Sequence, residues 1–202
     1  MFNIIKVTNG PVSTNTYLIG DETCYIIDPS DDIKRIEQQI SANFKGVKAI
    51  LLTHGHFDHV GGVDYFVNKY NVDVYMDLND LVLLDQDLMF KYGFKEFFRP
   101  VNSEIKDIFL LADKNIIIYE SKGHTKGSVL IYFKKENILF SGDTLFKNCI
   151  GRTDLPTASD KDMKESLKLI KSLDESIVVY PGHGSKTTLK EEFLNNDYLK
   201  FI

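Results

Sequence analysis

The stretch Thr53-His54-Gly55-His56-Phe57-Asp58-His59 places three imidazoles and one carboxylate within six positions. So dense a group of nitrogen and oxygen donors is typical of metal chemistry. Along an extended segment alternate side chains share a face, so we expect His54, His56 and Asp58 to point together. His59 reaches the same site if the chain turns at that point, and Gly61-Gly62 supplies the conformational freedom for a turn.

The two other histidines and one aspartate lie beside glycines after predicted strands. They are found in Gly123-His124-Thr125, Pro181-Gly182-His183-Gly184 and Ser141-Gly142-Asp143-Thr144. Loops at strand ends are where a rigid scaffold gathers distant residues at one edge. Asp143 on its own is also typical of a simple turn, and it counts as a candidate because a further ligand is needed.

The candidate ligands are too many for one tetrahedral ion and suit two ions that share a carboxylate. They are His54, His56, Asp58, His59, His124, Asp143 and His183. Without thiolates the set fits an open catalytic site better than a closed structural one. We expect two divalent metal ions, zinc first, with iron or manganese as alternatives.

Asp28 is a candidate for a supporting role. In Ile27-Asp28-Pro29 it can accept a hydrogen bond from a ligand imidazole. An aspartate before proline is equally typical of a turn. The sequence leaves these two interpretations open.

Apolar periodicity predicts two β-rich halves interleaved with amphipathic helices. Strands are expected at 2–7, 16–19, 24–27, 47–52, 72–76, 116–119, 129–133, 138–140 and 177–180. Helices are expected at 32–40, from Gly61 to Tyr70, after a Ser159 cap, and after a capping box formed by Thr188 and Glu191. The stretch 79–104 reads as helical and aromatic-rich. This order predicts an α+β fold, a four-layer αββα sandwich with two packed sheets and helices outside.

The bulk properties are those of one ordinary globular domain spanning residues 1–202. A net charge of −5 disfavours nucleic acid as a partner. No apolar run reaches the roughly 18 residues of a membrane-spanning helix, and no export signal is visible, so we expect a cytoplasmic protein without a membrane partner. Cys24 and Cys149 are far apart and are expected to be free thiols.

The order His54-x-His56-x-Asp58-His59, Gly-His124-Thr, Gly-Asp143-Thr and Gly-His183-Gly resembles the metallo-β-lactamase superfamily, most closely its short glyoxalase II-like hydrolases. The resemblance covers nearly the whole chain and implies the αββα fold. It assigns His54, His56 and His124 to one ion, Asp58, His59 and His183 to the other, and Asp143 to both. It also implies hydrolysis of a thioester such as S-lactoylglutathione, with a metal-bridging hydroxide as nucleophile that Asp58 orients.

The substrate side is where the sequence departs from the resemblance. Long-form glyoxalase II enzymes have a C-terminal helical domain that supplies basic residues for glutathione, whereas this sequence ends at Ile202, and no such domain is expected. Lys126 and Arg152 are the nearest cationic candidates for a substrate carboxylate, although each also suits a surface charge. Four aromatic residues form either a lid over the metal edge or ordinary helix packing: Phe90, Phe94, Phe97 and Phe98.

Other reactions of the superfamily stay as alternatives. Persulfide dioxygenases use one iron held by the equivalents of His54, His124 and Asp143, which this chain also has. Lactone hydrolysis is favoured by Phe57-Asp58-His59 and disfavoured by the segment 151–154. β-Lactam hydrolysis is not expected, because true β-lactamases lack the bridging aspartate. The thiol carrier, the acyl group and the oligomeric state are left open.

Overall fold

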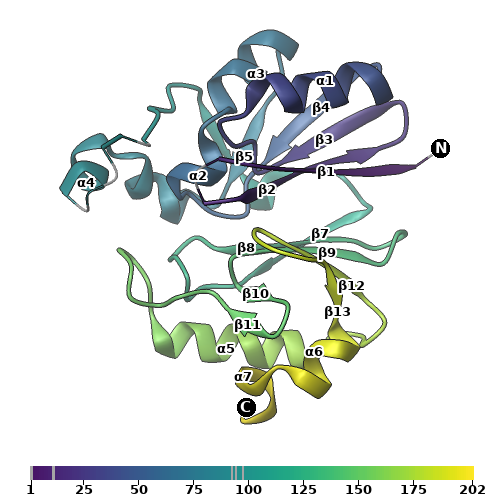
Figure 1. Cartoon of the computed structure of the whole chain (residues 1–202), viewed down its shortest axis with the longest axis vertical. Coiled ribbons are helices and arrows are strands. Elements are labelled where there is room, and N and C mark those ends of the chain that lie inside the picture. Colours follow the sequence, from purple (N-terminus) through teal and green to yellow (C-terminus); the bar gives the residue numbers. More distant parts are fainter. Residues whose placement is uncertain (1, 11, 92, 94, 97) are drawn as a thin grey trace. The chain divides into compact units, whose positions relative to one another are not determined.

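The computed structural model describes residues 2–10, 12–91, 93, 95–96 and 98–202. The chain forms two compact units, Met1–Leu110 and Leu111–Ile202, which are purple to teal and green to yellow in Figure 1. Each unit has its own sheet, helices and apolar core. Within the described part of the chain, no helix has the length and apolar character needed to cross a bilayer.

The first unit is built on a six-stranded sheet in the order β1-β2-β3-β4-β5-β6. Its strands are β1 (Asn3–Asn9), β2 (Thr14–Gly20), β3 (Thr23–Ile27), β4 (Gly46–Leu51), β5 (Val74–Met76) and β6 (Ile105–Asp107). The pairs from β1 to β3 are antiparallel and those from β3 to β6 are parallel. Its helices are α1 (Ile33–Asn43), α2 (Phe57–Val60), α3 (Val63–Tyr70), α4 (Gln86–Lys91) and the 3-10 helices η1 (Leu78–Leu84) and η2 (Ile108–Leu110).

Helices α1 and α3 cover one face of this sheet (Figure 1). The helical spacing of apolar residues explains the packing, because Ile36 and Ile40 of α1 and Phe66 of α3 are buried in one cluster with Ile26 and Ile50 of the sheet. β4 lies between two parallel neighbours, and its last three residues are buried. The strand that precedes the histidine motif is therefore among the most firmly held parts of the unit.

The second unit has a five-stranded sheet in the order β13-β12-β9-β8-β7 and a separate hairpin of β10 and β11. Its strands are β7 (Ile116–Glu120), β8 (Val129–Phe133), β9 (Ile138–Gly142), β10 (Leu145–Phe146), β11 (Cys149–Ile150), β12 (Val178–Pro181) and β13 (Thr187–Thr188). Its helices are α5 (Asp160–Lys171), α6 (Leu189–Asn195) and α7 (Asp197–Lys200). The pair of β9 and β12 is parallel, and the others in the sheet are antiparallel.

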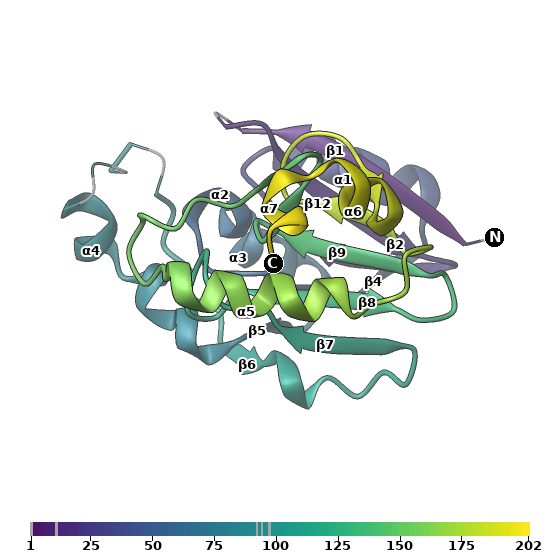
Figure 2. The same ribbon diagram turned by 90° about the horizontal axis from the view of Figure 1, so that it is seen from below.

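Helix α5 runs along the sheet of the second unit (Figure 2). Its buried residues Met163, Leu167 and Ile170 share a cluster with Leu139 of β9 and Val179 of β12. This spacing matches the helix expected after Ser159, whose side chain accepts a hydrogen bond from the Asp162 N–H. The helix start at Thr188 is also confirmed, since the Thr188 side chain accepts from the N–H of Glu191, while the Glu191 carboxylate accepts from the Thr187 hydroxyl.

The stretch 79–104 differs from the helical expectation. Helix α4 extends to Lys91, and the described residues between Lys91 and β6 form neither helix nor strand. Tyr92, Phe94 and Phe97 lie outside the described residues. β6, β10, β11 and β13 were not expected, because strands of two or three residues carry too few side chains for an alternating pattern.

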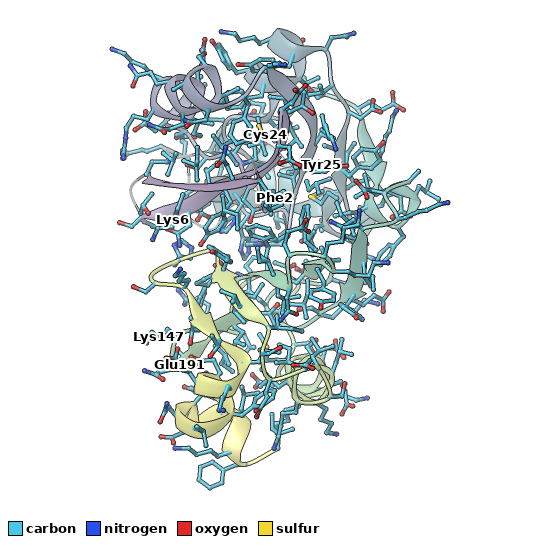
Figure 3. All side chains as sticks on the ribbon, turned by 90° about the vertical axis from the view of Figure 1, so that its right-hand side faces the viewer. Phe2, Lys6, Cys24, Tyr25, Lys147 and Glu191 are labelled. Carbon is cyan, nitrogen blue, oxygen red and sulfur yellow. The ribbon has the colours of Figure 1, made fainter. Side chains whose placement is uncertain are left out.

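Both cysteines are free thiols in different surroundings. Cys24, labelled in Figure 3, is buried on β3, and burial raises its thiol pKa to about 12. Cys149 on β11 is exposed. We expect native protein to react with one equivalent of a thiol reagent at pH 8 and with a second only after unfolding. A fast reaction that persists in Cys149→Ser protein would contradict this prediction.

Candidate metal centre

The histidine motif leaves β4 as an extended segment and then becomes helical. His56 has φ −67° and ψ 147° and caps α2, which begins at Phe57. Asp58 and His59 therefore lie on a helical turn, and the expected extended face ends at His56. The chain turns before Asp58, earlier than the sequence indicated, and in this turn His59 Nε2 lies 3.3 Å from Asp58 Oδ2.

Gly61 and Gly62 have a different role from the one predicted. Both have negative φ (−56° and −93°), which any residue adopts, so the freedom of glycine is not needed for the turn. Gly62 is needed for close packing, since a β-carbon there would lie 2.8 Å from the Ser30 carbonyl oxygen, whereas a β-carbon on Gly61 would meet the end of the Asp31 side chain. Burial raises the pKa of Asp31, an effect that Arg99 opposes and Asp58 reinforces.

The three imidazoles of the motif lie together in the first unit. The ring centroid of His54 is 4.8 Å from that of His56 and 4.1 Å from that of His59. The Nδ1 atoms of His54 and His59 contact Thr53 Oγ1 and Asp28 Oδ2 at 3.1 and 2.9 Å. On the other side of its ring, His59 Nε2 lies 3.3 Å from Asp58 Oδ2. These contacts at Nδ1 fix the orientation of the His54 and His59 rings, so Nε2 is the ring nitrogen that would bind a metal ion.

Asp28 lies at the centre of this hydrogen-bond network. It has both roles that the sequence left open, since its side chain supports a candidate ligand and its backbone forms a turn. It accepts hydrogen bonds from the Thr53 N–H at 2.7 Å and the Thr53 hydroxyl at 2.7 Å, besides its contact with His59. Its carboxylate is almost fully buried, and its backbone is left-handed, with φ 52°. Asp tolerates this conformation better than most residues.

Two further supports of the motif were missed from the sequence. The carboxylate of Asp80 on η1 is fully buried and accepts a hydrogen bond from the Gly55 N–H at 2.9 Å. The hydroxyl of Thr14 on β2 donates to Asp58 Oδ2 at 2.6 Å. A strand threonine and a single helix aspartate carry no local signal of such a role, because both are common in these elements.

The aromatic residues described near the motif pack together. Phe57, which lies between His56 and Asp58, shares an apolar cluster with Phe98, and Phe90 packs at its margin. The rings of Phe90 and Phe98 meet edge to face with centroids 6.2 Å apart. Phe90 and Phe98 therefore lie in the cluster of Phe57, while Phe94 and Phe97 lie outside the described residues.

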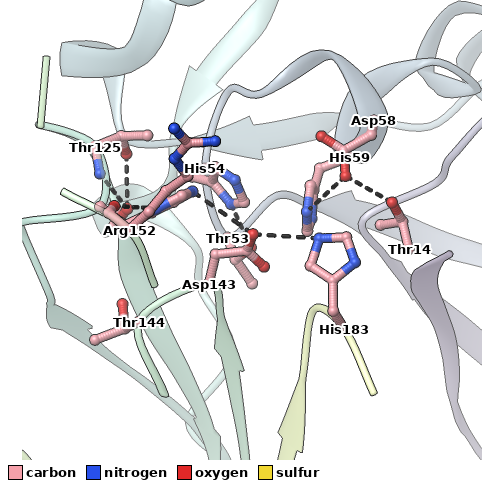
Figure 4. Close-up of polar contacts among 12 residues, drawn as sticks. Thr14, Thr53, His54, Asp58, His59, Thr125, Asp143, Thr144, Arg152 and His183 are labelled. Atoms are coloured by element: carbon pink, nitrogen blue, oxygen red, sulfur yellow. Dashed lines mark hydrogen bonds and ion pairs between the residues drawn. The ribbon is translucent and has the colours of Figure 1, made fainter. Parts of the chain in front are cut away.

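The second unit brings Asp143, His183 and His124 together. Asp143 follows β9 and His183 follows the parallel neighbour β12, so both lie at carboxyl ends of adjacent strands. Asp143 Oδ2 lies 3.3 Å from His183 Nε2 and 3.6 Å from His124 Nε2. Figure 4 draws the contact of Asp143 with His183 and, in the first unit, that of Thr14 with Asp58.

The separations between these donor atoms fit metal ligands. Two ligands on a tetrahedral ion with bonds of about 2.0–2.1 Å lie about 3.3–3.4 Å apart. His59 with Asp58, and His183 with Asp143, are each separated by 3.3 Å, which is longer than the usual N–H···O distance of about 2.7–3.2 Å. The nitrogen and carboxylate donors of each unit therefore fit divalent metal ions.

The two candidate substrate cations lie in exposed positions of the second unit. Lys126 is exposed, and its backbone N–H donates to Thr157 Oγ1. The guanidinium of Arg152 pairs with both oxygens of Asp154 at 2.6 and 2.7 Å. Its backbone carbonyl lies 2.9 Å from His124 Nδ1. Arg152 thus supports a candidate ligand through its main chain.

Gly151 is a further position where a β-carbon has no room. An added Cβ would lie 1.7 Å from the Asp143 carbonyl oxygen and 3.0 Å from His124 Nδ1. We expect Gly151→Ala to lower the free energy of unfolding by about 1–3 kcal/mol and to weaken metal binding, because the loop must shift. Gly46→Ala is the control, since its Cβ would meet only Thr23 Cγ2 at 3.9 Å. Equal melting temperatures and metal contents of the two variants would contradict the prediction.

Comparison with known proteins identifies the family. The family model of the metallo-beta-lactamase superfamily matches residues 9–183, and the chain belongs to this superfamily. The probable metallo-hydrolase YqgX of Bacillus subtilis is 34% identical over 94% of this chain and 94% of its own. The hydroxyacylglutathione hydrolase GloC of Haemophilus influenzae is 31% identical over 97% and 96%. The chain is thus a metallo-hydrolase of this superfamily.

Solved structures confirm the predicted fold class. A di-iron-bound form of TTHA1623 is 33% identical over 96% of this chain and 100% of its own, with a TM-score of 0.87. The BLEG-1 B3 metallo-beta-lactamase is 31% identical over 98% and 99%, with a TM-score of 0.86. The chain therefore has the αββα metallo-β-lactamase fold, in which two sheets are packed with helices. The family implies divalent metal ions.

Proposed function

We propose that this chain is a binuclear metal-dependent hydrolase of thioesters such as S-lactoylglutathione. The observation that carries the proposal is the spacing of nitrogen and oxygen donors, because imidazole and carboxylate atoms within each unit lie 3.3 to 3.6 Å apart. GloC supports the thioester class through its name, hydroxyacylglutathione hydrolase. The match covers 96% of the GloC chain, so the protein with this name is similar in length to the present chain.

In this proposal the seven ligands bind two ions, as the family resemblance implies. His54, His56 and His124 hold the first ion, Asp58, His59 and His183 hold the second, and Asp143 binds both. The arrangement of the second unit supports this division, because Asp143 Oδ2 is flanked by one histidine of each set. The donors suit zinc, iron or manganese, and the di-iron form of TTHA1623 makes iron a candidate beside zinc.

Two bound ions would supply acidification of water and positive charge for the oxyanion that develops during acyl transfer. The protein groups then have separable roles. Asp58 orients the attacking oxygen toward the thioester carbonyl, and Asp28 keeps His59 in one tautomer through Nδ1. The thiolate is a good leaving group, so no general acid is required of the chain.

The cations near the second unit's ligands would recognise a carboxylate on the thiol carrier. Arg152 is already paired with Asp154, so a substrate carboxylate must compete with that side chain. We expect Arg152→Gln to raise KM by about tenfold with kcat unchanged, because a charged hydrogen bond to substrate is lost. Lys126→Gln is measured in parallel. If neither variant changes KM, both residues are surface charges.

The direct test is thiol release from S-D-lactoylglutathione. Protein loaded separately with zinc, iron or manganese is compared with Asp58→Ala protein under the same conditions. Turnover that the variant lacks supports the hydrolase. Oxygen uptake with glutathione persulfide by the iron-loaded protein, without thioester turnover, would instead establish the dioxygenase alternative.

The similarity to BLEG-1 favours β-lactam hydrolysis as a second candidate. Asp143 argues against it, since the sequence pattern of true β-lactamases lacks this aspartate. A chromogenic cephalosporin assayed with the same metal-loaded preparations separates the two. If kcat/KM is higher for the cephalosporin than for acyl thioesters, β-lactam hydrolysis replaces thioester hydrolysis as the first candidate.

A further inference from the structure

The first residues of β2 are polar although they are fully buried. Thr14 and Thr16 both have 0% of their surface exposed. Buried hydroxyls are found where they have hydrogen-bond partners, because burying one without a partner is costly. The partner of Thr14 lies on the segment that carries Asp58 and His59, and the partners of Thr16 lie on the turn at Asp28, whose carboxylate contacts His59.

Thr14 acts on Asp58 directly. Its Oγ1 donates to Asp58 Oδ2 at 2.6 Å across 44 positions of sequence, and Figure 4 shows the contact. Asp58 Oδ2 also lies 3.3 Å from His59 Nε2. One carboxylate oxygen is thus fixed in place by a hydroxyl from the sheet, and rotation of the carboxylate about its own axis is restricted.

Thr16 acts on His59 through the turn at Asp28. Its hydroxyl donates to the Asp28 carbonyl at 2.7 Å and accepts from the Ser30 N–H at 3.1 Å. These bonds hold the left-handed turn that aims the Asp28 carboxylate at His59 Nδ1. Strand β2 therefore supports Asp58 directly through Thr14 and His59 indirectly through Thr16 and Asp28.

We propose that Thr14 is a positioning residue that fixes the Asp58 carboxylate and sets the affinity for the second metal ion. The inference rests on the ligand assignment of the proposed function. His54 is supported instead by its neighbour Thr53, so the effect of Thr14 is confined to the second ion. Residues that orient a ligand change metal affinity by about 10–100-fold when they are replaced.

The test is a two-step zinc titration of metal-free protein against a chromogenic chelator. Thr14→Val removes the hydroxyl at constant shape, and Thr14→Ser keeps it. A His59→Ala titration identifies which step belongs to the second ion. We expect Thr14→Val to weaken that step by about 10–100-fold, with the other step unchanged and Thr14→Ser equal to wild type.

The matched control is Thr187→Val. Thr187 is a buried strand threonine whose hydroxyl donates to a carboxylate, Glu192 Oε1 at 2.7 Å, outside the ligand set. It should bind both ions as wild type does. If Thr14→Val does not fold, Thr14→Ala replaces it, with circular dichroism as the check.

The outcomes separate this inference from the proposed function. Wild-type zinc affinity in both steps of a folded Thr14→Val or Thr14→Ala protein overturns the inference, as does a Thr14→Ser protein as weak as Thr14→Val. A wild-type protein that binds a single ion overturns it as well. Failure to hydrolyse any acyl thioester would remove the substrate assignment alone, since the titration requires no turnover.

Discussion

Replacing Asp58 by alanine is expected to lower kcat/KM for thioester hydrolysis by at least about 10³-fold while the fold survives. The variant loses a ligand of the second ion and the group that orients the attacking oxygen. The Asp58 carboxylate accepts from Thr14 and lies 3.3 Å from His59 Nε2, and alanine supplies no oxygen at that position. Kinetics, metal content and a thermal melt on the same preparation measure the three effects.

Asp73→Ala provides the control for Asp58→Ala. Asp73 is an exposed carboxylate that pairs with Lys106, and its loss should leave rate and metal content unchanged. His56→Ala should resemble Asp58→Ala in rate and should lose affinity for the first ion instead. Full activity in either Asp58→Ala or His56→Ala protein would refute the binuclear mechanism.

The elements that the sequence predicted are those with a strong local pattern. Helix α1 follows from Ile33, Ile36 and Ile40, and β4 follows from a short apolar run, because spacing along the chain alone determines which side chains can share a face. The edge strand β6 and the hairpin of β10 and β11 have no such pattern. Their pairing depends on partners that are distant in sequence or on only two residues.

The same division applies to the candidate site. The donor residues were visible because histidine and aspartate in Thr53–His59 lie within one segment, and the remaining donors follow predictable strands. Thr14 and Asp80 were not visible, since each acts on the motif from another element. The position of the turn at Phe57 does not follow from the glycines, because their φ values are ordinary and Gly62 has a packing role instead, with the Ser30 carbonyl 2.8 Å from where its β-carbon would lie.

The carboxylate of Asp28 is expected to contribute more to stability than any other group near the motif. Asp28→Ala would leave three buried donors without their acceptor, two on Thr53 and one on His59. Each such donor costs about 1–3 kcal/mol, and alanine is strained at the left-handed φ of 52°. We expect the metal-free variant to lose about 3–5 kcal/mol of unfolding free energy in urea.

Asp28→Asn distinguishes the hydrogen bonds from the backbone conformation. Asparagine tolerates a left-handed backbone and keeps one oxygen as the acceptor for the Thr53 N–H, but the –NH2 group that then replaces Oδ2 cannot accept from His59. It should therefore lose less stability than Asp28→Ala and still bind the second ion more weakly than wild type, because the tautomer of His59 is no longer fixed. Asp73→Ala is again the control for loss of an exposed carboxylate. An Asp28→Ala protein within about 1 kcal/mol of wild type would show that the Asp28 hydrogen bonds contribute little to the fold.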